Sequence, residues 1–238
     1  MSESHSHNEG VFQVKIGIIG AGFIGGTLTR RLSALGHEVR VSNSRSPETL
    51  SDLAAETGAH AVWSSEAAFD ADLVIVSIPQ KNVPDLPAGI LDAAKDGAPI
   101  IETNNYYPQQ RDGLIADIEN GKPESVWVAE HLGSLGADVI KVFNGIYWKH
   151  LLEKGQPKST ASRIALPVAG ADGPGKALVF DVVDQLGFDP VDGGTLADSW
   201  RQQPGTPVYG KDFDADGVKV ALAEATTDRA PEWRAESA

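Results

Sequence analysis

The chain of 238 residues contains no cysteine at all. Disulfides, thiolate-bound metals and cysteine nucleophiles are therefore excluded, and the fold has to be held by packing, hydrogen bonds and ion pairs. No apolar run approaches the roughly 20 residues that a membrane-spanning helix needs, and the first residues lack the basic and then apolar order of a signal peptide. We therefore expect a cytoplasmic protein that does not act at a membrane.

Basic residues are also scarce, since 20 Lys and Arg stand against 33 Asp and Glu, a formal net charge of −13. Such a charge opposes non-specific attraction to nucleic acid, so we expect no nucleic-acid partner. Any anionic ligand then needs a local group of basic side chains. Apolar residues make up 41% of the chain, which is close to the average for globular domains.

Short apolar segments alternate with segments of helical spacing. The segment Leu73 to Val76 has no polar face, which is typical of a strand in a parallel sheet that is covered on both sides. The alternation predicts an α/β protein with a doubly wound, Rossmann-type parallel sheet and a small C-terminal α/β lobe. Strands are predicted at 14–19, 39–41, 73–78, 99–101, 139–143 and 164–168.

A polar segment at 153–162 divides the chain. Beyond it, helices are predicted at 175–186, ended by Gly187, and near 217–225. The predicted organisation is a flexible tail at 1–10, a Rossmann domain at 11–152, a small C-terminal lobe at 163–225 and a frayed tail at 226–238.

A glycine-rich motif follows the first predicted strand. Gly20, Gly22 and Gly25 form a G-x-G-x-x-G pattern that includes Phe23 and Ile24 and opens a helical segment. The first glycine permits a tight turn, the second lets the backbone approach a pyrophosphate, and the third allows close packing of helix against strand. Because the helix N-terminus then points free N–H groups at the diphosphate, we predict a dinucleotide site here.

The end of the second predicted strand indicates which dinucleotide binds. NAD-binding proteins place a carboxylate about 20 residues after the glycines, where it binds the adenosine ribose. This chain has Asn43, Ser44 and Arg45 instead. A carboxylate would repel a 2′-phosphate, whereas the Arg45 guanidinium can pair with it and nearby hydroxyl and N–H groups can donate to it. The predicted cofactor is therefore NADP(H).

Three more loops follow predicted strands, at the edge where open α/β sheets bind ligands. They are expected to line the nicotinamide side of the site. The cofactor contacts predicted from these loops are Ser77, Ile78, Pro79, Asn104, Asn144 and Ile146.

A partial calcium-loop pattern at 212–217 is the one metal motif in the chain. Its twelfth position is Ala223, where a bidentate glutamate is required. We therefore predict no metal site, and expect Asp214 or Asp216 to cap the last helix.

Four motifs and one longer segment are spread over most of residues 14–197. They are GAGFIG at 20–25, NSR at 43–45, VIVSIP at 74–79, VIKVFNGI at 139–146 and the segment 186–196. Together they resemble the coenzyme F420-dependent NADP oxidoreductases, whose acceptor is an 8-hydroxy-5-deazaflavin, and the related cytosolic domain of six-transmembrane metalloreductases. The resemblance implies a Rossmann domain, a small lobe, an acceptor ring stacked on the nicotinamide between them, and a homodimer.

By the same resemblance, Ser44 and Arg45 hold the 2′-phosphate, Ile78 and Pro79 flank the cofactor, and Asn144 and Ile146 border the nicotinamide. The segment 200–210 matches no motif of the family, so its role and the acceptor stay open. Coenzyme F420 also carries an anionic tail. A basic patch for that tail is predicted from Lys141, Lys149, Lys154, Lys158, Arg163 and Arg201.

The predicted reaction is hydride transfer between NADP(H) and a small-molecule acceptor of the deazaflavin or flavin type. No protein acid is obligatory for it, because good orientation alone contributes on the order of 7–11 kcal/mol. A carbonyl or imine acceptor is the alternative and needs a proton donor. A non-catalytic NADPH-binding redox sensor is a third hypothesis. The candidate catalytic residues are Tyr106, Tyr107, His131, Asn144, Tyr147 and His150.

Overall fold

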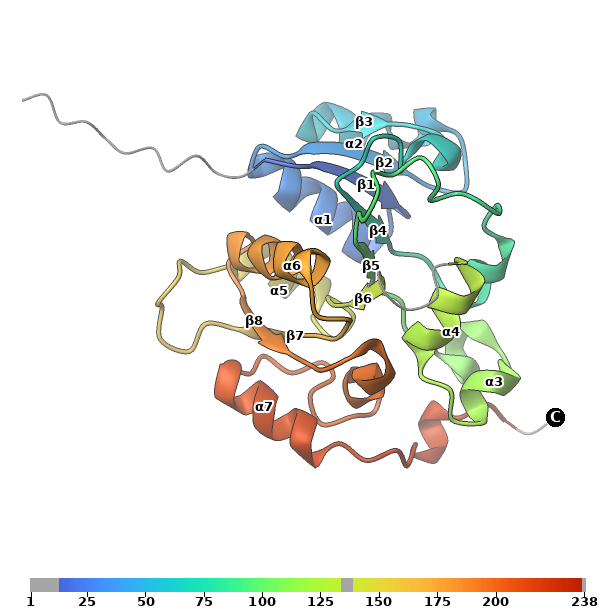
Figure 1. The fold of residues 1–238 in the computed structure, drawn as a ribbon, viewed down its shortest axis with the longest axis vertical. Coiled ribbons are helices and arrows are strands. Elements are labelled where there is room, and N and C mark those ends of the chain that lie inside the picture. Colours follow the sequence, from blue (N-terminus) through green and yellow to red (C-terminus); the bar gives the residue numbers. More distant parts are fainter. Residues whose placement is uncertain (1–12, 134–138, 237–238) are drawn as a thin grey trace, which may run out of the picture.

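The computed structural model describes residues 13–133 and 139–236, which form a six-stranded parallel sheet and a separate parallel pair of strands (Figure 1). The order in the large sheet is β3-β2-β1-β4-β5-β6, which is the strand order of a Rossmann fold and confirms the predicted fold class. The strands are β1 (Lys15–Ile19), β2 (Glu38–Ser42), β3 (His60–Ala61), β4 (Leu73–Val76), β5 (Ile100–Glu102) and β6 (Val139–Lys141).

The central strands send alternate side chains into two cores, one on each face of the sheet. In β4, Leu73 and Ile75 belong to one core and Val74 and Val76 to the other, because successive residues of a strand point to opposite faces. This explains the absence of a polar face in the sequence of this strand.

The helices are mostly short. They are α1 (Phe23–Ala34), α2 (Ser51–Thr57), α3 (Ala116–Glu119), α4 (Glu124–His131), α5 (Trp148–Glu153), α6 (Pro174–Gln185) and α7 (Ala215–Glu224). The last is capped at its N-terminus by Asp214, whose carboxylate accepts a hydrogen bond from the Gly217 N–H at 2.9 Å, as predicted. Among the described residues, no helix combines the length and the apolar character needed to cross a membrane.

The C-terminal part docks on the edge of the large sheet. Its strands β7 (Ala165–Val168) and β8 (Asp189–Asp192) are joined by α6, and Ala169 exchanges two backbone hydrogen bonds with Lys141 of β6. Side chains of α6 share one continuous core with those of α1 and β1. The Arg31 guanidinium adds hydrogen bonds from α1 to the carbonyls of Leu151, Leu152 and Leu186. The polar segment 153–162 therefore does not separate two independent cores.

The expectation of a frayed tail after residue 225 is wrong for residues 226–236. This segment returns to the Rossmann domain and lies beside α3 (Figure 1), where the Ala235 N–H donates to Glu119 at 2.8 Å. Trp233 packs against Tyr107 and Tyr209, with ring centroids 6.2 and 6.1 Å away. The polar composition of the segment 226–236 gave no sign of this packing. One tryptophan and a few hydrogen bonds hold the segment in place, and such contacts leave no periodic pattern in the sequence.

Candidate nucleotide and acceptor site

The glycine turn after β1 is tightly packed at two of its glycines and open at the third. Gly20 has φ +107, and a Cβ there would lie 2.1 Å from the Ser77 carbonyl oxygen. A Cβ on Gly25 would lie 1.9 Å from the Gly20 oxygen. A Cβ on Gly22 would meet nothing within 4 Å. The packing thus follows the three roles expected of the motif, with an open approach at Gly22 for a ligand.

A cleft of about 650 Å³ runs from this turn to the end of β2. The side chain of Asn43 shapes the loop there, since it accepts from the Arg45 N–H at 2.8 Å and donates to Thr49 at 2.9 Å. Ser44 and Arg45 are exposed, and Arg45 forms no ion pair with a carboxylate in the described part of the chain. The guanidinium is therefore available to an anionic group in this cleft. Asp85, which was not predicted, also lines it.

A second cleft of about 620 Å³ adjoins the first, because both are lined by Gly22, Ser77, Ile78 and Pro79. It brings together the loops after β4, β5 and β6 with the segment around Tyr209. The predicted residues on its walls also include Phe23, Ile24, Asn104, Tyr107, Asn144, Ile146 and Tyr147. Three loops that are far apart in the sequence thus surround one space.

Asn104 faces this second cleft with an unused donor. It is only 3% exposed, and its Oδ1 accepts from the Ile78 N–H at 3.1 Å. Its Nδ2 has no hydrogen-bond partner among the described residues. A buried amide N–H without a partner is costly, so this atom is suited to a ligand carbonyl.

Asn144, a catalytic candidate from the sequence that lines the second cleft, also has a structural task. Its Nδ2 donates to the Gln202 carbonyl at 2.7 Å and to Asn105 at 3.1 Å, and its Oδ1 accepts from Gln202 Nε2 at 3.0 Å. These bonds join the loops after β5 and β6 to the segment 200–210. Gln202 was missed because an isolated glutamine carries no sequence signal.

A buried ion pair lies beneath the loop that carries Asn104. Lys141 Nζ lies 3.0 Å from Glu102 Oε2, and both side chains are fully buried. Ser125 also donates to Glu102 at 2.7 Å, and the Asn104 N–H donates to the same carboxylate. Lys141 also donates to the Asn104 carbonyl, so the pair holds this loop in place.

Several predicted groups lie away from the clefts. His131 is exposed and contacts Trp127, His150 pairs with Asp212 at 2.9 Å, and the Tyr106 hydroxyl donates to the Gly113 carbonyl at 2.8 Å. None of the three lines either cleft.

The predicted basic patch is also wrong. Lys141 is buried, and the nearly buried Arg163 pairs with Asp184 at 2.6 Å. Lys154 pairs with Asp212. Spacing along the sequence could not show that these cations already had partners.

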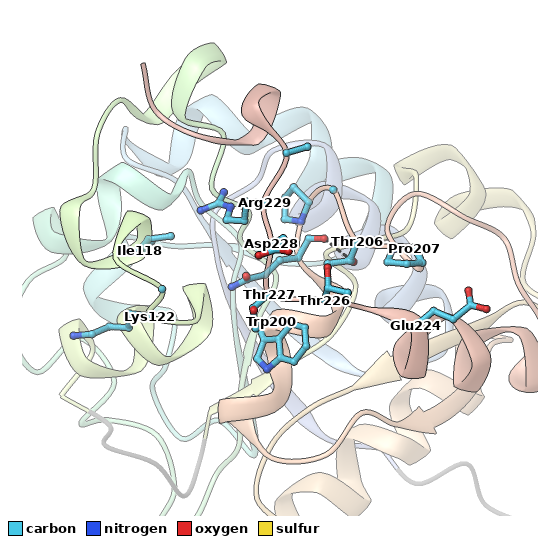
Figure 2. Close-up of a pocket in the computed structure, with 15 residues that line it drawn as sticks. Ile118, Lys122, Trp200, Thr206, Pro207, Glu224, Thr226, Thr227, Asp228 and Arg229 are labelled. Carbon is cyan, nitrogen blue, oxygen red and sulfur yellow. Dashed lines mark hydrogen bonds between the residues drawn. The ribbon is translucent and has the colours of Figure 1, made fainter. Parts of the chain in front are cut away.

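A third cavity, of about 400 Å³, lies between α3, the segment 203–207 and the returning C-terminal segment (Figure 2). Trp200, Thr226 and Thr227 lie on its walls. Its lining shares no residue with the two clefts at the glycine turn. It is therefore a separate feature of the C-terminal part.

Residues 15–106 match the model of a family described as NADP oxidoreductase, coenzyme F420-dependent. The matched residues are less than half of the chain. The match confirms the resemblance indicated by the motifs at 20–25, 43–45 and 74–79. The later motifs of this chain lie outside the matched residues.

Individual proteins extend the comparison. The hypothetical protein SMa0349 from Sinorhizobium meliloti is 28% identical with a TM-score of 0.69, over 85% of this chain and 95% of its own. A structure from Arthrobacter sp. FB24, provisionally assigned as an F420-dependent NADP reductase, has 22% identity and a TM-score of 0.62 over 77% of this chain and 86% of its own, which shows the fold alone. Protein YjhV of Escherichia coli (strain K12) is 42% identical over 59 residues, 25% of this chain and 43% of that protein. This match spans less than half of YjhV.

Glu124 makes the stability of the protein depend on pH. Burial raises the pKa of this fully buried carboxyl to about 7, against the lowering influence of Lys141 and then Arg229. From about pH 4.5 upward an unfolded chain releases the proton that the folded chain keeps, so stability falls as pH rises toward 7. We expect Glu124 to lower the free energy of unfolding by about 2–3 kcal/mol between about pH 5 and pH 8. Urea unfolding of wild type and Glu124→Gln at both pH values measures this, and equal pH slopes would contradict it.

Proposed function

We propose that the protein is an NADPH-dependent oxidoreductase that passes a hydride to a deazaflavin or flavin-type ring. The observation that carries the proposal is the pair of adjoining clefts that share Gly22, Ser77, Ile78 and Pro79. A dinucleotide has a matching shape, because its two nucleotide halves, one for each cleft, are joined by a diphosphate that would lie at the shared residues. The match to the F420-dependent family supports both the nucleotide and the acceptor.

Each part of NADP(H) has a suited group in this proposal. The open approach at Gly22 and the N-terminus of α1 receive the diphosphate. Arg45 and Ser44 bind the 2′-phosphate, and the unpartnered Asn104 Nδ2 donates to the nicotinamide carboxamide. When bound, NADPH supplies a hydride, and the walls of the second cleft orient the acceptor and exclude water.

The acceptor is tested by following oxidation of NADPH at 340 nm with four probes: 8-hydroxy-5-deazaflavin, flavin mononucleotide, a small aldehyde and a cyclic imine. We expect the two ring acceptors to be reduced. Oxidation with only the aldehyde or the imine would favour the carbonyl or imine reductase, and oxidation with none of them would favour the redox sensor.

Arg45→Ala is expected to weaken NADPH binding by about 1.5–3 kcal/mol and to leave NADH binding unchanged, because only NADPH carries the 2′-phosphate. Titration of both nucleotides by isothermal calorimetry measures this. Arg40→Ala is the matched control, since Arg40 lies on β2, just before the loop of Arg45, bonds to the Phe69 carbonyl at 3.1 Å and lines neither cleft. Unchanged NADPH affinity in Arg45→Ala, or tighter binding of NADH than NADPH by the wild type, would reject the assignment.

A further inference from the structure

Two tyrosine side chains from distant parts of the chain meet on the wall of the second cleft. Tyr107 comes from the loop after β5 and Tyr209 from the segment 200–210, 102 positions later. Their hydroxyl groups are hydrogen-bonded to each other. Of these two tyrosines, only Tyr107 was a candidate from the sequence, so the tertiary structure supplies Tyr209 as the second member of the pair.

The surroundings hold both rings in place. Asp112 accepts from the Tyr107 N–H at 2.7 Å, and the Arg111 guanidinium lies 5.0 Å from the centre of the Tyr107 ring. Trp233 packs against both rings. Next to Tyr209, the Gly210 N–H donates to the Gly145 carbonyl at 3.0 Å, which ties this segment to the loop after β6. Such support is what a site with a fixed orientation needs.

The pairing also defines what the hydroxyl groups can do. Each tyrosine has one O–H proton, and one of the two protons is used between them, so one donor is left for a ligand. Burial raises the pKa of Tyr107, and burial together with the neighbouring Tyr107 raises that of Tyr209. A phenol with a raised pKa keeps its proton at neutral pH, so it can donate a hydrogen bond without giving the proton away. The pair therefore fits an acceptor that needs no proton from the protein.

We propose that the Tyr107–Tyr209 pair donates a hydrogen bond to the carbonyl end of the deazaflavin or flavin ring, where negative charge develops as the hydride arrives. The inference rests on the proposed function and assigns catalytic residues to it. A donor aimed at developing charge stabilises the transition state more than the ground state.

The electrons and atoms balance without a protein acid. A hydride with its electron pair leaves C4 of the dihydronicotinamide and forms a C–H bond at C5 of the deazaflavin, or an N–H bond at N5 of a flavin. The nicotinamide becomes a cation, and the reduced ring carries the negative charge on N1 and the oxygen at C2. No bond to either tyrosine forms or breaks.

The first measurement is single-turnover hydride transfer from NADPH to 8-hydroxy-5-deazaflavin and to flavin mononucleotide, in wild type, Tyr107→Phe, Tyr209→Phe and the double variant. We expect each single change to slow transfer by about 10²-fold, as for loss of one oxyanion donor, and the double change to add little because the hydroxyls act as a unit. The dissociation constant for NADPH should change by less than about twofold.

The second measurement is independent of turnover. Wild type and both single variants are titrated with oxidised and with reduced 8-hydroxy-5-deazaflavin without nicotinamide nucleotide, above neutral pH, where the reduced ring is anionic. We expect loss of a hydroxyl to weaken binding of the reduced ring by about tenfold and of the oxidised ring by less. Hydride addition at C5 breaks the conjugation across the ring and concentrates negative charge on N1 and the oxygen at C2, and hydrogen bonds to such a charged acceptor are stronger.

Tyr106→Phe is the matched control. This substitution removes the hydroxyl of the adjacent residue, which bonds to Gly113 and Ile115 outside the cleft. It should lower the stability and leave both readouts unchanged. If Tyr107→Phe and Tyr209→Phe transferred hydride at the wild-type rate and bound both ring forms as tightly as the wild type, the inference would be overturned and the proposed function would stand. A wild type that binds neither ring form and transfers no hydride would overturn the proposed acceptor and the inference together.

Discussion

Replacing Lys141 with methionine should lower the free energy of unfolding by about 3–5 kcal/mol. The substitution removes the cation 3.0 Å from Glu102 and leaves a fully buried carboxylate without its counter-charge. The fully buried Glu124 is influenced by the same lysine, so its ionised form also loses support. The loss is large because the cost of an unpaired buried charge exceeds the net value of the pair.

Chemical unfolding of Lys141→Met, Glu102→Gln and the double variant measures this effect. The double variant should be less destabilised than the sum of the two single variants, because it leaves neither charge unpaired. The glutamine oxygen can still accept from the Asn104 N–H, and its NH2 group can donate to the Ser125 hydroxyl. A loss below about 1 kcal/mol in Lys141→Met, or strict additivity, would show that the pair does not act as described.

Gly22→Ala and Gly25→Ala both change one glycine of the same turn to alanine, but we expect different losses. Gly25→Ala should lose stability, and Gly22→Ala should lose NADPH binding. At Gly25 the new Cβ would lie 1.9 Å from a backbone oxygen, so we expect the free energy of unfolding to fall by about 3 kcal/mol or more. At Gly22, with φ −73, the Cβ enters the open approach, so stability should change by less than about 1 kcal/mol. The same methyl group should weaken NADPH binding by about tenfold or more, because it occupies space needed by the diphosphate.

Thermal unfolding without ligand, combined with NADPH titration, separates the two outcomes. Gly58→Ala serves as a control for backbone strain alone, because its φ is +75, a Cβ there meets nothing within 4 Å, and it lies outside both clefts. If Gly22→Ala bound NADPH like the wild type, the diphosphate would have to lie elsewhere.

Much of the Rossmann domain could be predicted because its signals are local. Apolar segments such as Leu73 to Val76 report burial on both faces of a strand, and a glycine pattern reports a backbone geometry that side chains forbid. The two-residue strand β3 was missed because it is too short to show a periodic pattern. The crossover from β4 to β5 contains the 3-10 helix Gln80–Asp85 instead of a long α-helix, with Pro84 inside it.

By itself the sequence determined the parallel sheet, the glycine turn and the position of Arg45 beyond β2, because each depends on residues that are neighbours in the chain. Only the tertiary structure decided that Tyr209 lies against Tyr107, that Lys141 neutralises Glu102, and that residues 226–236 pack on the Rossmann domain. These contacts join residues tens of positions apart, and their stability comes from burial and pairing that no single segment encodes. The wall of the second cleft therefore depends on the tertiary fold, whereas the glycine turn depends on the local sequence motif.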